Sequence, residues 1–235
     1  MAIDVNKVYR VVLSILNKEQ RGYLTPDQFN RLGRQAQLDL FEKSFYDYNR
    51  QLTKRNIQGV NSEYGDIADK IEEKIDLFAE SQEVLLNGNS FATSDLDHEL
   101  YKVVQLTKDD GITEIEKVKK SEYTYMAASK LTEPSENYPV YIYDKGEFKI
   151  IPNTINNCVI DYIRKPEDPI WNYTVGEGSS YTYTTTGSQD FELHPSDETD
   201  LVIKILALAG VVIKDPSVVQ VAQQQEVNNV NQENS

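Results

Sequence analysis

The sequence has almost none of the residues on which disulfide frameworks and metal centres depend. Its 235 residues include one cysteine, Cys158, and two histidines, His98 and His194, and these three lie far apart in the chain. A single cysteine excludes an internal disulfide framework and suits a reducing compartment. Because a structural zinc site requires about four such ligands close together, the sequence predicts no metal site, and nothing in it indicates a cofactor.

Long apolar runs are also missing. No segment approaches the roughly 18 consecutive apolar residues of a membrane-spanning helix. The first residues mix charged with apolar side chains, unlike a signal peptide or a membrane anchor. We therefore expect no membrane association. The remaining composition, with 39% hydrophobic and 26% charged residues, is typical of a globular protein large enough to bury a core.

Motifs of catalysis are absent as well. The chain has no glycine-rich phosphate loop, no G-x-S-x-G and no H-E-x-x-H. Two acidic clusters, "SDLDHEL" and "KDDGITEIE", lack the alternating ligands of a calcium loop, and we interpret both as turns or surface loops. The sequence therefore predicts a protein that is not an enzyme, with no catalytic residue. An enzyme is the less favoured alternative, and its site would use Asp95, Asp97 and Glu99.

Four single residues have plain structural interpretations. Cys158 opens an apolar strand and is expected to be a small buried hydrophobe, with no base beside it to make it a nucleophile. We interpret His98 as exposed and expect His194 to pack at a strand–helix junction. Trp171 stands beside two prolines, where it either anchors an interface or covers the core beneath a loop.

Charge is unevenly distributed along the chain. The net charge is −14, yet residues 1–60 carry ten Lys and Arg against six Asp and Glu, so the acidic excess lies entirely after them. An acidic surface opposes DNA binding, because affinity for DNA comes from neutralising phosphates. A mildly basic end on an acidic body indicates two electrostatically different faces. The alternative is an acidic surface that only aids solubility.

Helical patterns dominate the first part of the chain. Residues 3–17 predict an amphipathic helix. A second helix is predicted from "TPDQF" to about residue 53, with Thr25 as N-cap, Pro26 in the first helical position and Gln28 completing a capping box. A third, short helix is expected over residues 67–78.

Two apolar stripes follow the long second helix. The first consists of Phe29, Leu32, Ala36 and Leu40, and the second of Leu38, Phe41, Phe45, Tyr48 and Leu52. Two stripes indicate burial on two sides. Either one side faces a neighbouring subunit, or the helix is simply central to the core.

The middle of the chain shows strand patterns. "ELYKVVQLTKDDGITEIEKV" predicts a hairpin around Asp-Asp-Gly, and "YPVYIYDKGEFKIIP" predicts a second hairpin with its turn at residues 144–146. A short helix capped by Ser121 would separate them. "CVIDYIRKP" reads as another strand, and the Tyr- and Thr-rich residues 179–188 are expected in a β-ribbon or a projecting loop tip. Residues expected to form cross-strand pairs in the second hairpin are Tyr141, Tyr143, Phe148 and Ile150.

Helices return at the end of the chain. One is expected to be capped by Ser196, and another begins at Asp215-Pro216. The last 13 residues, from Gln223, include eight Asn and Gln and cannot fold alone. We expect them to become ordered against a partner; the alternative is a frayed end. Residues expected on the buried face of the first of these helices are Leu201, Ile205, Leu208 and Ala209.

These patterns predict an α+β fold, because helices flank a β-rich middle. The expected regions are an N-terminal helical region (1–80), a β-rich region with hairpins (81–195), C-terminal helices (196–222) and a polar tail (223–235). The N-terminal and C-terminal helices are expected to pack together, with the β-rich unit inserted between them.

Several phrases, taken together, resemble a known family. They are "YLTPDQFNRLGRQAQLDLFEKSFYDYNRQL", "KIEEKIDLF", "LTEPSENYPVYIY", "YIRKPEDPIWNY" and "FELHPSDETDLVIKILALAGVVIKDPSVVQ". They resemble neck or head–tail connector ring proteins of crAss-like and related short-tailed bacteriophages. The resemblance extends from about Leu24 to Gln220.

The resemblance implies a structural virion protein, made in the host cytoplasm and assembled between portal and tail. Its implied partners are about 12 copies of itself in a ring, the portal protein and neighbouring neck or tail rings. Genome DNA would pass through the channel without specific binding. Other possibilities are a tail tube or tail-hub protein, or an unrelated secreted carbohydrate-binding module that uses the Tyr-rich stretch.

Overall fold

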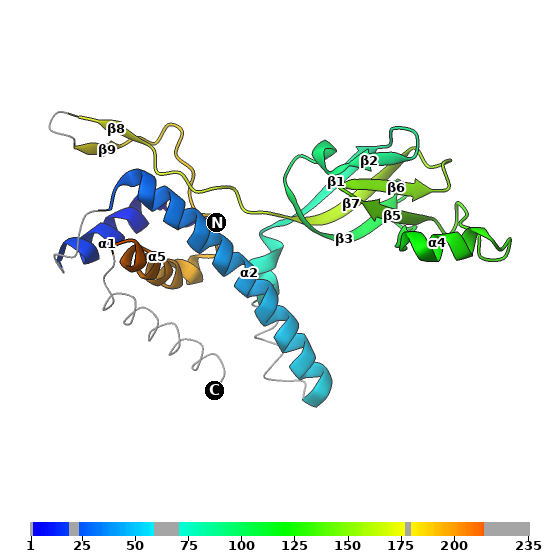
Figure 1. Ribbon diagram of the computed structural model, residues 1–235, viewed down its shortest axis with the longest axis horizontal. Coiled ribbons are helices and arrows are strands. Elements are labelled where there is room, and N and C mark those ends of the chain that lie inside the picture. Colours follow the sequence, from blue (N-terminus) through cyan, green and yellow to red (C-terminus); the bar gives the residue numbers. More distant parts are fainter. Residues whose placement is uncertain (1, 19–23, 59–70, 177–179, 214–235) are drawn as a thin grey trace. The chain divides into compact units, whose positions relative to one another are not determined.

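The protein is described here by a computed structural model, which describes residues 2–18, 24–58, 71–176 and 180–213. It contains several helices and three sheets, so the predicted α+β class is confirmed. The chain forms two compact units (Figure 1). Unit 1 comprises residues 1–77 and 166–235, and unit 2 comprises residues 78–165.

Three helices form the body of unit 1: α1 (Val5–Lys18), α2 (Pro26–Gln58) and α5 (Glu198–Ile213). α5 packs against both α1 and α2, as expected for N-terminal and C-terminal helices that share a core (Figure 1). Residues 71–76 are also helical, within the range expected for a third helix. The fully buried residues that each helix contributes include Val8 and Val12 from α1, Phe29 and Ala36 from α2, and Leu201, Ile205 and Ala209 from α5.

The N-terminus of α2 forms the predicted capping box. The Thr25 N–H donates to Oε1 of Gln28 at 3.1 Å, and the Gln28 N–H donates to Oγ1 of Thr25 at 3.3 Å. The first apolar stripe lies in the core of unit 1, with Leu32 and Leu40 partly buried beside it. In the second stripe Phe41 is buried and contacts the ring of Phe45. The side chain of the last member of that stripe lies outside the described part of the chain.

The segment that returns from unit 2 is fixed to α2 by polar contacts. Gln37 is buried, its Nε2 donates to the carbonyl of Glu167 at 2.7 Å, and its Oε1 accepts from the N–H of Glu192 at 2.9 Å. Close approach of Phe191 is possible because position 33 is glycine: a Cβ there would lie 3.1 Å from Cζ of Phe191. Phe191 also forms a single antiparallel bridge with Ile3.

Trp171 is buried in the core of unit 1 at the centre of an aromatic cluster. Its ring lies 4.2 Å from that of Tyr9, and its Nε1–H donates to Oδ1 of Asn6 at 3.1 Å. The Tyr-rich stretch forms a two-stranded ribbon, β8 (Tyr173–Val175) and β9 (Tyr181–Tyr183). Tyr173 and Tyr183 each lie 5.7 Å from Trp171. The ribbon therefore packs its tyrosines onto the core.

Unit 2 consists of two small sheets that share one core. The first has the order β1 (Ala79–Leu85), β7 (Asn157–Arg164) and β3 (Leu100–Lys108), all antiparallel. The second has the order β2 (Ser90–Ala92), β6 (Glu147–Ile151), β5 (Val140–Asp144) and β4 (Glu116–Lys117), in which β4 runs parallel to β5. Alternate residues of β7 point into this core, and Phe91 stacks on Phe148 at 4.6 Å.

One predicted hairpin is confirmed and the other is only partly correct. β5 and β6 are joined at Lys145 and Gly146, both with positive φ, and the expected pairs Tyr141↔Ile150 and Tyr143↔Phe148 form. Around Asp-Asp-Gly the chain does turn back, but only as far as residues 114 and 115. β3 then pairs mainly with β7, and the short β4 runs parallel to β5 instead of completing the hairpin.

Two predicted helix caps are wrong. α4 (Lys120–Ala127) has Lys119 as its N-cap, and the side chain of Glu122 accepts from the N–H of Lys119 at 3.0 Å. Ser121 lies inside that helix. Before α5, a short 3-10 turn (Pro195–Asp197) is capped by His194, whose Nδ1 accepts from the N–H of Ser196.

The units divide the chain differently from the regions drawn on the sequence. Residues 166–195, placed with the β-rich region, belong to unit 1. Their strand-like residues bind the helices through Gln37 and Trp171 rather than extending either sheet of unit 2. The helix expected at 216–222 and the polar tail at 223–235 lie outside the described residues.

Candidate functional site

The carboxylates considered for an enzyme have structural contacts. Oδ2 of Asp95 accepts from the N–H of Ala92 at 2.8 Å, and Glu99 forms an ion pair with Lys165. The N–H of Asp97 donates to Oε1 of Gln82 at 3.0 Å. The side chains of Asp95 and Glu99 thus stabilise a turn and a strand end. None of Asp95, Asp97 and Glu99 lines the pocket described below.

Cys158 is fully buried in the core of unit 2, and burial raises the pKa of its thiol to about 12. It therefore remains a protonated, inert thiol at neutral pH. Across residues 2–18, 24–58, 71–176 and 180–213, no three His, Cys, Asp or Glu side chains lie together as a metal ion would require. The helices of the same residues include none with the length and hydropathy to cross a bilayer.

A pocket of about 510 Å³ lies in unit 2 between the loop after α4 and the edge formed by β4 and β5. Figure 1 shows α4 beside β5 at this edge. The buried residues at its base are Pro134, Pro139 and Val140. Around them stand Met126, Leu131 and Tyr138, of which Leu131 is 94% and Tyr138 80% exposed. Apolar side chains this exposed, gathered at a concave surface, are typical of an interaction site.

The loop that carries these apolar side chains is held by its own hydrogen bonds. Oγ1 of Thr132 donates to the carbonyl of Met126, and the N–H of Thr132 donates to the carbonyl of Ser129, both at 3.1 Å. Ser135 and Tyr138 exchange backbone hydrogen bonds. The exposure of Leu131 and Tyr138 therefore follows from an ordered loop rather than from a lack of local structure.

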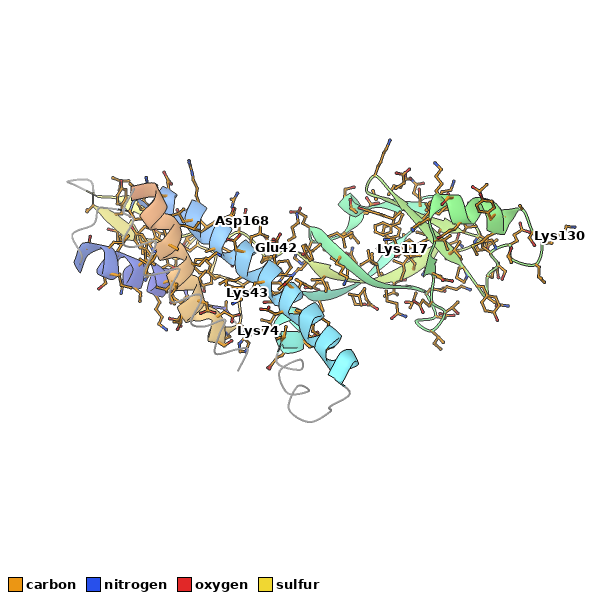
Figure 2. The ribbon with its side chains drawn as sticks, turned by 60° about the horizontal axis from the view of Figure 1, so that its bottom comes forward. Glu42, Lys43, Lys74, Lys117, Lys130 and Asp168 are labelled. Atoms are coloured by element: carbon orange, nitrogen blue, oxygen red, sulfur yellow. The ribbon has the colours of Figure 1, made fainter. Side chains whose placement is uncertain are left out.

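The charged side chains that line this pocket are all acidic: Glu114, Glu116 and Glu133. Burial first, and the Glu114 carboxylate second, raise the pKa of the nearby Tyr141. Lysines are close in sequence, but Lys119, Lys120 and Lys130 are exposed and do not line the pocket. Figure 2 shows Lys130 at the tip of the loop, pointing away from the sheet. The pocket thus combines an apolar surface with negative charge, a combination suited to a cationic amphipathic partner.

Unit 1 presents a surface of the opposite kind on α1. Val11 and Ile15 are 36% and 40% exposed, and as an i, i+4 pair they lie on one face of the helix. Arg10 and Lys7 are exposed beside them. Lys7 pairs with Glu198 at 2.7 Å, whereas Arg10 makes no ion pair with any described residue. We call Lys7, Arg10, Val11 and Ile15 the α1 face.

Sequence reasoning missed both surfaces. A possible interface was assigned to one of the two stripes of α2, because a regular spacing of apolar residues can be recognised in the sequence. The stretch "KDDGITEIE" was interpreted only as a turn or surface loop. The available signal was Leu131 and Tyr138 in a stretch rich in Ser, Glu and Pro, which cannot be a core segment. The exposure of Val11 and Ile15 depends on where α5 packs, and no local pattern contains that information.

A scan of the sequence against protein-family models found no matching family, and a search of curated proteins found no match either.

Proposed function

We propose that the protein is a structural component of a bacteriophage virion, assembled as a ring in the neck between portal and tail, around the DNA channel. The observation that carries this proposal is the presence of two different exposed apolar surfaces on the two units. One is the basic α1 face, and the other is the acidic pocket beside α4. A closed ring requires two unlike, complementary surfaces on each subunit.

The resemblance of the sequence to phage neck proteins supports the same proposal. It rests on phrases distributed over both units, from "YLTPDQF" in unit 1 to "LTEPSENYPVYIY" in unit 2. The second phrase includes Leu131 and Tyr138, two of the exposed residues at the pocket. Those residues are therefore part of the pattern that the resemblance depends on.

The charge of the chain also suits a protein around a DNA channel. With a net charge of −14, the protein would repel phosphates, so that a genome could pass without being held. The carbohydrate-binding alternative is less favoured, because Tyr173 and Tyr183 of the ribbon are partly buried and pack against Trp171.

Assembly on the portal tests the proposal. The purified protein, with a mass of 26.9 kDa, is mixed with the portal protein of the same phage, and the mass of the complex is measured by native mass spectrometry. We expect a discrete gain of about 12 copies per portal, the closed-ring number that the resemblance implies. A portal whose mass is unchanged, at concentrations where other neck proteins bind, would contradict it.

A further inference from the structure

We propose that neighbouring copies of this chain join through these two surfaces, with the α1 face of one copy seated on the acidic pocket beside α4 of the next. This inference rests on the proposed ring and identifies its subunit contact. The occupant of the pocket is therefore a second copy of the chain.

Complementary chemistry is the first argument. The pocket offers Leu131, Tyr138 and Met126 within a border of three carboxylates. The α1 face offers Val11 and Ile15 with Arg10 one residue from Val11. Burying the apolar pairs against each other gives affinity, while Arg10 opposite the carboxylates selects the partner and its orientation.

The exposed charge of Arg10, which pairs with no residue in the described part of the chain, is the second argument. Two other exposed cations of unit 1 are paired, Lys7 with Glu198 and Arg34 with Asp168, each at a distance below 3 Å. Figure 2 shows Asp168 beside α2, where that second pair forms. Arg10 stands next to the exposed apolar residues of α1 and has no such partner among the described residues. An exposed guanidinium beside an apolar pair is suited to an acidic, apolar pocket.

The geometry is heterologous, since the two surfaces lie on different units of the chain. A contact between unlike surfaces propagates from copy to copy and closes as a ring or continues as a filament. The chain's own tail is a poorer occupant of the negatively charged pocket, because residues 223–235 contain two Glu and no Lys or Arg.

Cysteine crosslinking in the full chain tests the contact. Two variants, Arg10→Cys and Glu133→Cys, are assembled together on the portal and treated with a short bifunctional maleimide. The native thiol does not interfere, because Cys158 is fully buried and protonated. We expect covalent dimers from the mixture and none from either variant alone, since the proposed contact places residue 10 of one copy against residue 133 of the next and neither residue against its own equivalent.

Arg31→Cys mixed with Glu133→Cys is the matched control, because Arg31 is an exposed arginine of the same unit that lies on α2. Equal crosslinking from the control, or no crosslinking in rings that do assemble, overturns the contact and leaves the ring intact. If the unsubstituted chain forms no assembly on the portal at all, the ring and the contact are both overturned.

Charge reversal supplies a second readout without crosslinker. Arg10→Glu should weaken assembly by roughly tenfold, and adding Glu133→Arg in the same chain should restore most of it, because the pair is then reversed but still complementary. The control Arg31→Glu should leave assembly within about twofold. Arg10→Glu without effect, or without rescue by Glu133→Arg, overturns the contact.

Discussion

At the scale of single residues, the acidic loop at 109–113 illustrates how a carboxylate can be structural. Asp110 accepts hydrogen bonds from Oγ1 of Thr113 at 2.7 Å and from the N–H groups of Thr113 and Ile112 at 2.8 and 2.9 Å. These bonds, led by the hydroxyl of Thr113, lower the pKa of Asp110 to about 2. The carboxylate holds the turn, in which Gly111, the next residue, has a positive φ.

The pH dependence of this turn follows from the direction of that shift. Because the pKa is lower in the folded protein than the ordinary 3.8, the contribution of Asp110 to stability is present above about pH 4 and is lost as the pH falls toward 2. NMR titration of the Asp110 carboxyl carbon should show this low pKa. Asp110→Ala should lower the melting temperature at pH 7 and should reduce the difference between pH 7 and pH 3.

Asp109→Ala is the matched control for that substitution, since the neighbouring carboxylate is also exposed. It should change the melting temperature little. A normal carboxyl pKa at Asp110, or equal effects of the two substitutions, would show that the turn does not depend on Asp110.

At the scale of elements, Gln37 joins three segments that are remote in sequence. Its amide binds the carbonyl of Glu167 and the N–H of Glu192, so α2 is tied to both ends of the returning segment. Gln37→Leu would bury an apolar side chain and leave both backbone groups without this partner. We expect a loss of about 2–4 kcal/mol in the free energy of unfolding, measured by urea denaturation.

Gln35→Leu provides the comparison, because Gln35 is exposed on the same helix and its side chain bonds Asp39, one turn away. Its effect should stay within about 0.5 kcal/mol. If both substitutions cost the same, the buried amide of Gln37 is not what holds the returning segment.

The elements that local chemistry defines were predictable from sequence. The capping box at Thr25, the turn at residues 145 and 146 and the alternating apolar residues of β7 are local signals, and each is found in the structure. The caps at Ser121 and Ser196 were predicted from residue preference alone, and Lys119 and His194 occupy those positions instead.

Pairings between distant segments were not predictable in the same way. The end of β3 bonds residues 113 and 115 across a local turn, yet its long ladder is to β7, whose paired residues lie 50 to 64 positions later. The assignment of residues 166–195 to unit 1 depends on Gln37 and Trp171 binding across the unit. The candidate pocket likewise forms only when the loop after α4 meets the edge of β4 and β5.

At the scale of the whole molecule, unit 2 is a continuous stretch with its own core, inserted between the two parts of unit 1. Its ends meet: Ala79 pairs with Ile163, and the N–H of Arg164 donates to the carbonyl of Phe78 at 2.9 Å. A fragment of residues 78–165 should therefore fold alone. Dispersed amide signals in its NMR spectrum and a cooperative melt are the expected results.

An unfolded fragment 78–165 would mean that unit 2 requires the rest of the chain. Phe148→Ala in the fragment gives a control for the melt, since Phe148 is fully buried and stacks on Phe91. That substitution should cost about 3–5 kcal/mol and abolish or sharply lower the transition.

The charge of the whole chain gives a prediction about DNA. Because the net charge is −14, the counterion release that drives nonspecific binding is unfavourable, and we expect no shift of duplex DNA at micromolar protein and about 150 mM salt. The gel-shift assay needs a basic neck or portal protein as a positive control. A shift that persists at that salt concentration would contradict the proposal that DNA passes through an acidic channel without being bound.

The most direct test of the proposed function is the position of this protein in the virion. Electron cryomicroscopy of the phage that encodes the chain, with symmetry applied about the tail axis, should resolve a ring between portal and tail into which α1, α2 and α5 of unit 1 and the two sheets of unit 2 fit as separate bodies. The same density should place α1 of one copy against the loop after α4 of the next. Virions in which this protein lies away from the tail axis, or from which it is absent, would contradict the proposal.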